Sequence, residues 1–187
     1  MKSKITNIIG WLFGKTIKTN DHIEVERRWL MHPSNFIPFR QMNGGIFDSA
    51  TIRQAYVIDE SGACLRIRSS IKANSESAFI TCKGTTIDSP YSSEYEMSIP
   101  YDLAEKLMAN QKVMTKVRHR VYHKNYMVEV DSFADDAINA HLGGYMIAEI
   151  EFPDIESANK FTAPSFFGEE VTADKKRYSN AAMFKLL

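Results

Sequence analysis

One short stretch, Glu24-Val25-Glu26-Arg27-Arg28, carries two acidic side chains two residues apart within a run of alternating character. In a β-strand, residues i and i+2 point to the same face of the sheet. Glu24 and Glu26 therefore share one face, and the apolar Ile23 and Val25 lie on the other. Taken alone, this pattern is typical of a strand with one solvated face.

The same spacing of like charges recurs along the chain. The acidic pairs with this spacing are Glu24/Glu26, Glu94/Glu96, Glu129/Asp131 and Glu149/Glu151. The basic sets are Arg66/Arg68 and Lys116/Arg118/Arg120, and Lys83 stands alone on its strand. A solvated strand face tends to mix charge signs, because like charges on one face repel. The separation of signs predicts a concave wall with distinct places for cations and anions.

Period-two alternation extends over most of the chain between residues 22 and 151, which is typical of β-strands. The expected strands are 22–31, 51–59, 62–71, 77–84, 92–99, 113–122, 125–133 and 144–152. The expected helices are 101–111, 155–161 and 173–186. Eight short strands at this spacing favour an antiparallel barrel or sandwich.

The composition is that of a soluble globular protein, since 44% of the 187 residues are hydrophobic and 25% are charged. A chain of this length fits one domain with a sizeable core. The 23 basic and 23 acidic side chains cancel, which argues against a broad basic surface for duplex nucleic acid. Two cysteines make no disulfide framework, so a reducing, cytoplasmic location is expected.

Residues 1–20 are expected to form an N-terminal extension, and residues 21–187 the domain itself. The extension contains an apolar run at 8–13 that lysines flank on both sides. This run is far too short to span a bilayer, and no transmembrane segment is predicted. It favours a short amphipathic helix that packs on the domain, with contact to a membrane surface or a partner as the alternative.

The charge pattern also indicates the chemistry of the site. Converging carboxylates are hard oxygen ligands, which suit Mg²⁺ or Mn²⁺ better than zinc. Arginine and lysine side chains grip phosphoryl oxygens, arginine through two parallel hydrogen bonds and lysine as a point charge. The five histidines have no metal-ligand spacing, and no Gly-rich phosphate loop or nucleophile motif is evident. A polyphosphate bridged by a metal ion is therefore the expected ligand.

These residues resemble the CYTH superfamily, also called triphosphate tunnel metalloenzymes, over about residues 22–184. The family begins on a strand E-x-E-x-K, which corresponds here to Glu24–Arg28. The other motifs follow in order: R-Q-x-Y at 53–56, R-x-R at 66–68, T-x-K at 81–83, E-x-E at 94–96, K-x-R at 116–118, E-x-D at 129–131 and E-x-E at 149–151. The tail at 167–180 is similar to small bacterial members that hydrolyse inorganic triphosphate.

The resemblance implies an α+β fold with an eight-stranded antiparallel β-tunnel, that is, a closed barrel with a charged interior and a few flanking helices. It also implies metal-dependent hydrolysis of a triphosphate, either inorganic tripolyphosphate or a nucleoside triphosphate. The implied metal ligands are Glu24, Glu26, Asp131, Glu149 and Glu151. The implied substrate-binding residues are Arg28, Arg66, Arg68, Lys83, Arg118 and Lys176, with Lys175 competing for the last place. The implied catalytic residues are Glu94, Glu96 and Lys116.

The chain departs from the family pattern at a few places, and these keep other functions open. Arg28 replaces the motif lysine, which preserves charge but not geometry, and Ser92 stands where a basic residue is common. The segment 31–51 is longer than in compact relatives. A class IV adenylate cyclase or a thiamine triphosphatase shares the tunnel but acts on an organic triphosphate. A third alternative is a non-hydrolytic binder of polyphosphate, nucleotide or a 5′-triphosphate RNA end.

Overall fold

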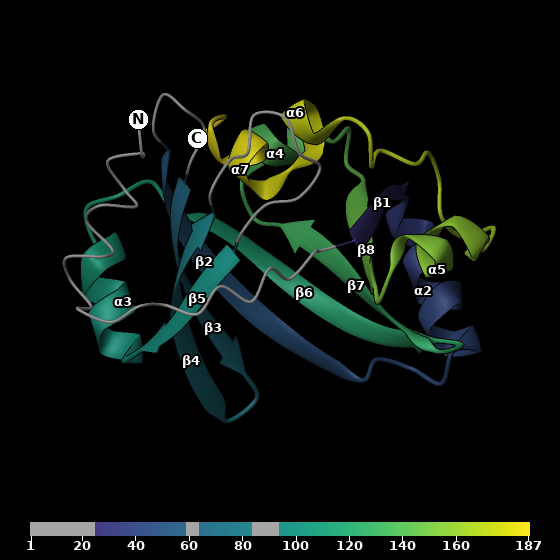
Figure 1. The fold of residues 1–187 in the computed structure, drawn as a ribbon, viewed down its shortest axis with the longest axis horizontal. Helices are drawn as coiled ribbons and strands as arrows, with labels where there is room; N and C mark the ends of the chain where they lie inside the picture. Colours follow the sequence, from purple (N-terminus) through teal and green to yellow (C-terminus); the bar gives the residue numbers. More distant parts are fainter. Residues whose placement is uncertain (1–24, 59–63, 84–93) are drawn as a thin grey trace.

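A computed structural model describes residues 25–58, 64–83 and 94–187. Its centre is one eight-stranded antiparallel sheet with the strand order β1-β8-β7-β6-β2-β3-β4-β5 (Figure 1). The strands are β1 Val25–Met31, β2 Asp48–Ile58, β3 Cys64–Lys72, β4 Ser75–Lys83, β5 Glu94–Ile99, β6 Met114–His123, β7 Tyr126–Phe133 and β8 Met146–Phe152. All eight strands expected from the period-two pattern are confirmed, with ends that differ by a few residues.

The prediction of a closed barrel needs correction. Among the described strands, β1 pairs only with β8 and β5 pairs only with β4, so the two ends of the strand order do not meet. The other edge of β1 is instead hydrogen-bonded to residues 168–171. The sheet is therefore open, although it is eight-stranded and antiparallel as expected. Alternation within a strand determines which side chains share a face. Closure depends on strand tilt and on the register between the two edge strands, which no strand's own pattern specifies.

Six helices accompany the sheet in the described part of the chain (Figure 1). They are α2 Pro33–Met42, α3 Tyr101–Met108, α4 Asp136–His141, α5 Ile155–Lys160, α6 Lys175–Tyr178 and α7 Asn180–Phe184. The helices expected at 101–111 and 155–161 are confirmed in shorter form. The helix expected at 173–186 is interrupted at Ser179, whose backbone is extended and whose hydroxyl oxygen accepts the Ala182 N–H to begin α7. None of these helices is long and apolar enough to cross a membrane.

Helix α2 was not predicted, and its prolines at 33 and 38 are residues that disfavour a helix interior. Pro33 nevertheless lies in the first turn, where a missing N–H costs nothing, and the His32 ring accepts the Ser34 N–H as a cap. The helix forms within the long segment 31–51 and covers the outer face of the sheet. There Phe36 stacks on His119 of β6, with ring centroids 5.1 Å apart.

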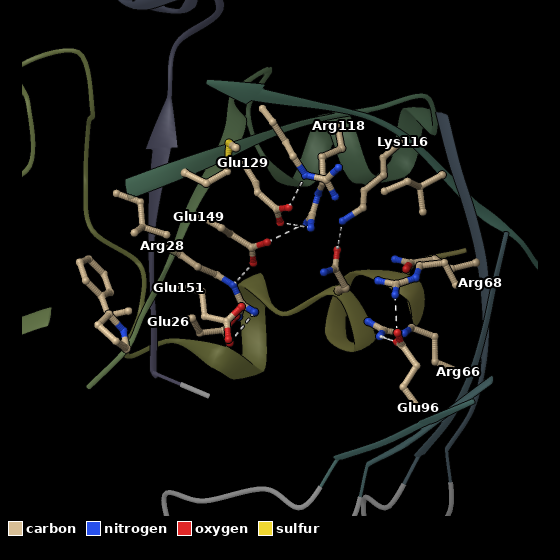
Figure 2. A pocket seen from close by; sticks show the side chains of 18 residues that line it. Glu26, Arg28, Arg66, Arg68, Glu96, Lys116, Arg118, Glu129, Glu149 and Glu151 are labelled. Atoms are coloured by element: carbon tan, nitrogen blue, oxygen red, sulfur yellow. Dashed lines mark hydrogen bonds and ion pairs between the residues drawn. The ribbon is translucent and has the colours of Figure 1, made fainter. Parts of the chain in front are cut away.

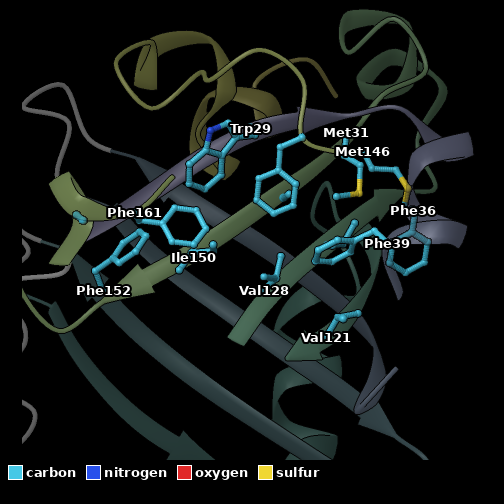
Figure 3. Close-up of a cluster of buried hydrophobic side chains, with 14 residues drawn as sticks. Trp29, Met31, Phe36, Phe39, Val121, Val128, Met146, Ile150, Phe152 and Phe161 are labelled. Carbon is cyan, nitrogen blue, oxygen red and sulfur yellow. The ribbon is translucent and has the colours of Figure 1, made fainter. Parts of the chain in front are cut away.

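The main apolar core lies on the face of β1, β8 and β7 that is opposite to the charged side chains (Figure 3). Trp29 is its centre, with ring centroids 5.8 Å from Phe161 and 5.1 Å from Phe167. Strand parity explains the arrangement, because Trp29 and Ile150 alternate with the charged residues of their strands. Burial of this aromatic cluster therefore turns the charged side chains of the same strands toward the other, concave face.

Candidate functional site

A pocket of about 730 Å³ lies on the concave face of the sheet, a volume that suits a small ligand (Figure 2). Strands β1, β2, β3, β5, β6, β7 and β8 all contribute to its wall. Its charged lining is Glu26, Arg28, Arg66, Arg68, Glu96, Lys116, Arg118, Arg120, Glu129, Glu149 and Glu151. The charged side chains therefore line one cavity, as expected. On β1, β6, β7 and β8, however, cations and anions pair with one another and do not occupy the distinct places that the separation of signs predicts.

The first part of the wall is built by β1 and β8, whose register sets Glu26 opposite Glu151 and Arg28 opposite Glu149. The Arg28 guanidinium donates from Nη2 to Glu26 Oε1 at 2.7 Å and from Nε to Glu149 Oε1. Burial by itself would lower the pKa of Arg28, but the attraction of Glu149 and Glu26 outweighs it, so the pKa is raised. Arg28 is thus held as a cation between two carboxylates, and only 8% of it is exposed.

The second part of the wall is centred on Asp131 of β7, which is almost fully buried. Arg118 donates to both of its oxygens, from Nε and Nη2, each at 2.6 Å, and Lys116 Nζ donates at 2.5 Å. Burial alone would raise the pKa of Asp131, but these two cations hold it well below the usual range. Burial and Arg118 lower the pKa of Lys116, despite the attraction of Asp131 and Glu149.

Arg118 joins these two parts into one network. Its Nη2 donates to Glu149 Oε2 at 2.9 Å and its Nη1 donates to Glu129 Oε2. Burial would raise the pKa of Glu149, but Arg28 and Arg118 lower it. Both carboxylate oxygens of Glu149 are therefore bound by guanidinium groups. We refer to Glu26, Arg28, Glu149, Arg118, Asp131 and Lys116 together as the acidic wall.

The opposite side of the pocket is built by β3, β4 and β5. The register places Arg66, Thr81 and Glu96 in one row across these three strands. Glu96 Oε2 accepts hydrogen bonds from Arg68 Nη2 and from Thr81 Oγ1, each at 2.9 Å, and Arg66 Nη2 lies 3.4 Å away. We refer to Arg66, Arg68, Thr81 and Glu96 as the arginine wall. Here one carboxylate oxygen lies among donors that can also bind a phosphoryl oxygen.

Comparison with known proteins supports the architecture. No family model matches the chain. The crystal structure of an inorganic triphosphatase aligns with 87% of this chain and 94% of its own length, at 28% identity and a TM-score of 0.56. A protein of Pyrococcus horikoshii aligns with 73% of this chain and 84% of its own, at 18% identity and a TM-score of 0.54, which shows the fold alone.

The chain has a CYTH-like fold. In sequence, 57 residues are 44% identical to an inorganic triphosphatase of Nitrosomonas europaea. That stretch is 30% of this chain, and the match spans 34%, about a third, of the length of that curated relative. A relation to inorganic triphosphatases is therefore found both in a local sequence match and in the fold of nearly the whole described chain.

Most of the site residues expected from the sequence line the pocket of this CYTH-like domain. They are Glu26, Arg28, Arg66, Arg68, Glu96, Lys116, Arg118, Glu149 and Glu151. Asp131 lies directly behind them, bound to Lys116 and Arg118. Lys175 and Lys176 are exposed on α6 and are not among the lining residues. Glu24, the side chains of Lys83 and Glu94, and the expected N-terminal extension lie outside the described residues.

Two uncharged polar lining residues, Gln54 and Asn180, had no role in the sequence-based assignment. Gln54 of β2 is 1% exposed, and its Nε2 has no hydrogen-bond partner among the described residues. Its strand register places it opposite Arg68, and it occurs within the R-Q-x-Y motif, which was the only available signal. Asn180 of α7 accepts a hydrogen bond at its Oδ1 atom from Lys116 Nζ, at 3.3 Å. This contact spans 64 residues, so no local pattern could reveal it.

The lining also includes charges that the sequence grouped correctly but did not assign. Arg120 donates from Nε to Glu129 Oε1 at 2.8 Å and from Nη1 to Asp48 Oδ1 at 3.3 Å. Asp48 also binds Lys72 of β3. Of these residues, Arg120 and Glu129 line the pocket. The pairs link β2, β3, β6 and β7 beside it.

The chemistry of the acidic wall fits a divalent cation, because its donors are carboxylate oxygens. In the described residues, no three His, Cys, Asp or Glu side chains are grouped closely enough to hold one. Glu26 and Glu149 instead share the cationic group of Arg28, while Glu151 lines the same pocket opposite Glu26 and is exposed. The guanidinium of Arg28 thus lies between two of the carboxylates that the sequence predicts to be metal ligands.

Proposed function

We propose that this protein hydrolyses a triphosphate with Mg²⁺ or Mn²⁺, and that inorganic tripolyphosphate is its preferred substrate. The observation that supports this most strongly is the opposition of two walls in one pocket. Carboxylates of β1 and β8 lie on one side, and paired arginines of β3 lie on the other. A polyphosphate bound to a cation presents the complementary charges. The relation to inorganic triphosphatases points to the same substrate class.

Phosphate binding falls to the arginine wall and its neighbours. Arg66 and Arg68 supply charged donors, and Arg guanidinium groups bind phosphate in a planar, bidentate manner. The buried Nε2 of Gln54 is an additional donor, and a phosphoryl oxygen would satisfy it. Asn180 orients Lys116 toward the pocket through its Oδ1 atom. These groups would fix the chain of phosphates in line across the cavity.

Metal binding falls to Glu26, Glu149 and Glu151, with Glu24 as the remaining ligand from the sequence motif. The divalent ion, when bound, neutralises negative charge that develops on the phosphate oxygens. Lys116 and Arg118 add fixed positive charge from the protein, held in place by Asp131. In this proposal Glu96 would accept a proton or hydrogen bond from the attacking water, after Arg66 and Arg68 exchange it for the phosphates.

The test is phosphate release from a substrate panel. Tripolyphosphate, ATP, GTP, thiamine triphosphate and triphosphorylated RNA are each assayed with Mg²⁺, Mn²⁺ or excess chelator. We expect tripolyphosphate to be hydrolysed fastest and chelator to abolish turnover. Arg68→Met should lower kcat/KM by about 10²-fold or more, whereas Arg53→Met, a neighbouring arginine that binds Glu105 outside the pocket, should retain activity. Absence of phosphate release from every substrate would contradict the proposal.

The extensive internal pairing of the pocket favours one other function. With Glu149 bound by two guanidinium groups and Glu96 bound by two arginines, the site could hold a triphosphate without turning it over. Equilibrium binding of tripolyphosphate in the same panel distinguishes the two functions. Binding without phosphate release under either metal would indicate a non-hydrolytic binder, and a cyclic nucleotide product would indicate a cyclase.

A further inference from the structure

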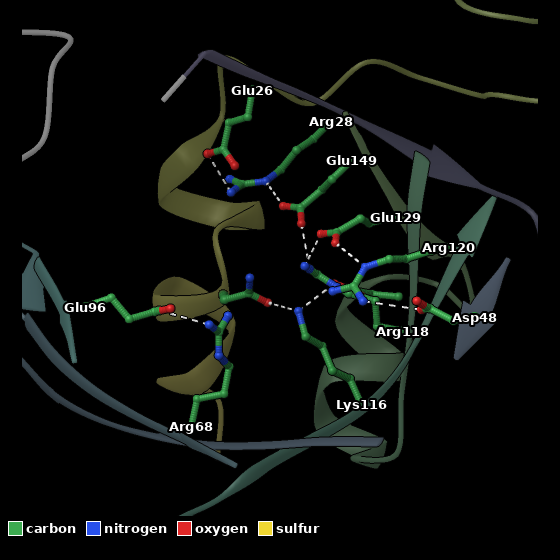
Figure 4. Close-up of polar contacts among 12 residues, drawn as sticks. Glu26, Arg28, Asp48, Arg68, Glu96, Lys116, Arg118, Arg120, Glu129 and Glu149 are labelled. Carbon is green, nitrogen blue, oxygen red and sulfur yellow. Dashed lines mark hydrogen bonds and ion pairs between the residues drawn. The ribbon is translucent and has the colours of Figure 1, made fainter. Parts of the chain in front are cut away.

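Arg28 is unusual among the pocket cations because of its partners. Figure 4 shows its guanidinium between Glu26 and Glu149, and these are the two carboxylates that its ion pairs involve. Both carboxylates are also expected to bind the divalent ion. By contrast, Arg118 is clamped by both oxygens of Asp131 in addition to its contact with Glu149. Arg28 is therefore the cation whose contacts a metal ion would most readily replace.

A guanidinium and a metal ion compete for this place. Mg²⁺ or Mn²⁺ binds carboxylate oxygens at roughly 2.0–2.2 Å, and the Arg28 Nη2 atom already lies 2.7 Å from Glu26 Oε1. Two positive groups at such a distance repel strongly in a site with little exposure to water. The second oxygen of Glu149 is also engaged, because it accepts a hydrogen bond from Arg118 at 2.9 Å. Departure of Arg28 would therefore remove a competing positive charge and free one oxygen of each carboxylate for a metal ion.

We infer that Arg28 is a tethered cation that occupies the divalent-ion position and sets the metal affinity of the site. Its departure releases Glu26 and Glu149 to the ion, beside Glu151, which lies opposite Glu26 and already faces the pocket. The same guanidinium is then available to a phosphate group in the cavity. Metal and triphosphate would thus bind more tightly together than separately. Metal binding frees Arg28 for a phosphate group, and a phosphate group that binds Arg28 frees Glu26 and Glu149 for the metal.

The test measures metal binding in the absence of any phosphate, so it does not depend on turnover. Mn²⁺ is titrated into the full-length protein, and the free ion is followed by electron paramagnetic resonance. Arg28→Met should bind Mn²⁺ about tenfold to a hundredfold more tightly than the wild type, because a competing positive charge is removed. Arg28→Lys should fall between them, because an ammonium lacks the fork that reaches both carboxylates.

Arg27→Met is the matched control, because Arg27 is the neighbouring residue on β1 and points to the opposite face. It binds Glu170 and the carbonyl oxygens of Ala158 and Phe161, all outside the pocket. We expect its Mn²⁺ affinity to equal that of the wild type. A second readout is thermal unfolding, in which saturating Mn²⁺ should raise the melting temperature of Arg28→Met more than that of the wild type.

The outcomes separate this inference from the proposed function on which it rests. Wild-type binding of Mn²⁺ with equal or weaker binding by both Arg28 variants would overturn the role of Arg28 and leave the proposed function standing. An equal gain in affinity in Arg27→Met would overturn it as well, because the effect would be one of net charge. If neither the wild type nor any variant binds Mn²⁺, both the role of Arg28 and the metal dependence in the proposed function would be overturned. If Arg28→Met does not fold, Arg28→Lys decides the question.

Discussion

The two walls of the pocket both contain ion pairs, and the pair Lys116–Asp131 is more deeply buried than the pair Arg68–Glu96. In the acidic wall, the side chains of Lys116 and Asp131 are 3% and 1% exposed. In the arginine wall, those of Arg68 and Glu96 are 24% and 34% exposed. Figure 4 shows the first set as a continuous chain of contacts and the second as a separate pair across the cavity. Ion pairs of similar residue types can therefore contribute very differently to stability.

The physical reason is the cost of removing a charge from water. A buried ion pair loses several kcal/mol of hydration, so removal of one partner leaves an uncompensated charge. A partly exposed pair is screened by solvent and typically contributes up to about 1 kcal/mol. The acidic wall should therefore act as a structural element that also binds ligand. The arginine wall can exchange its internal partner for a phosphate at little cost.

The largest expected effect concerns Asp131. Asp131→Asn removes the anion that holds Lys116 and Arg118 and leaves both cations buried. We expect a loss of about 3–5 kcal/mol in the free energy of unfolding, measured by urea denaturation. Glu96→Gln on the arginine wall is the control and should lose less than about 1 kcal/mol. Similar losses in the two variants would remove the distinction between the walls.

The pH dependence of Asp131 sharpens this contrast. Its pKa in the folded protein is depressed, so its stabilising contribution is complete above the ordinary aspartate value of about 3.9 and is lost as pH falls toward the folded value. The stability difference between wild type and Asp131→Asn should thus be constant near neutral pH and shrink below about pH 4. A difference in the free energy of unfolding that grows as the pH falls would contradict this prediction.

A smaller effect is expected on the arginine wall. Glu96→Gln removes the negative charge that Arg66 and Arg68 share, which should strengthen metal-free binding of tripolyphosphate by a few-fold. The reason is that phosphate no longer competes with an internal carboxylate. Isothermal titration with tripolyphosphate in chelator measures it. Weaker binding by this variant would mean that Glu96 supports the phosphate site rather than occupying it.

Local alternation was sufficient to predict which charged side chains share the pocket face of each strand, but not how they pair across strands. Because i and i+2 share a face, the pairs at Glu149 and Arg66 had to point to the same side of their strands. The structure places these side chains in one pocket, and their individual roles remain proposals. Sheet closure was predicted wrongly, because it depends on contacts between β1 and β5 at opposite ends of the strand order.

Other features required information that a single segment does not contain. The helix expected at 173–186 breaks at Ser179, because this serine favours an N-cap over continuation of the helix. The break brings Asn180 to Lys116, a contact that no spacing rule predicts. The partners of Arg28 were also unpredictable, since the sequence places Arg28 and Glu149 on separate strands and only the β1–β8 register brings them together.

The central claim is that the acidic wall binds the cation and the arginine wall binds the phosphates. The most direct measurement titrates Glu26→Gln and Arg68→Met by calorimetry, first with Mn²⁺ alone and then with tripolyphosphate in chelator. Glu26→Gln should lose about tenfold or more in Mn²⁺ affinity and keep its binding of tripolyphosphate. Arg68→Met should keep the Mn²⁺ affinity of the wild type and lose affinity for tripolyphosphate. Parallel weakening of both ligands in both variants would contradict the claim.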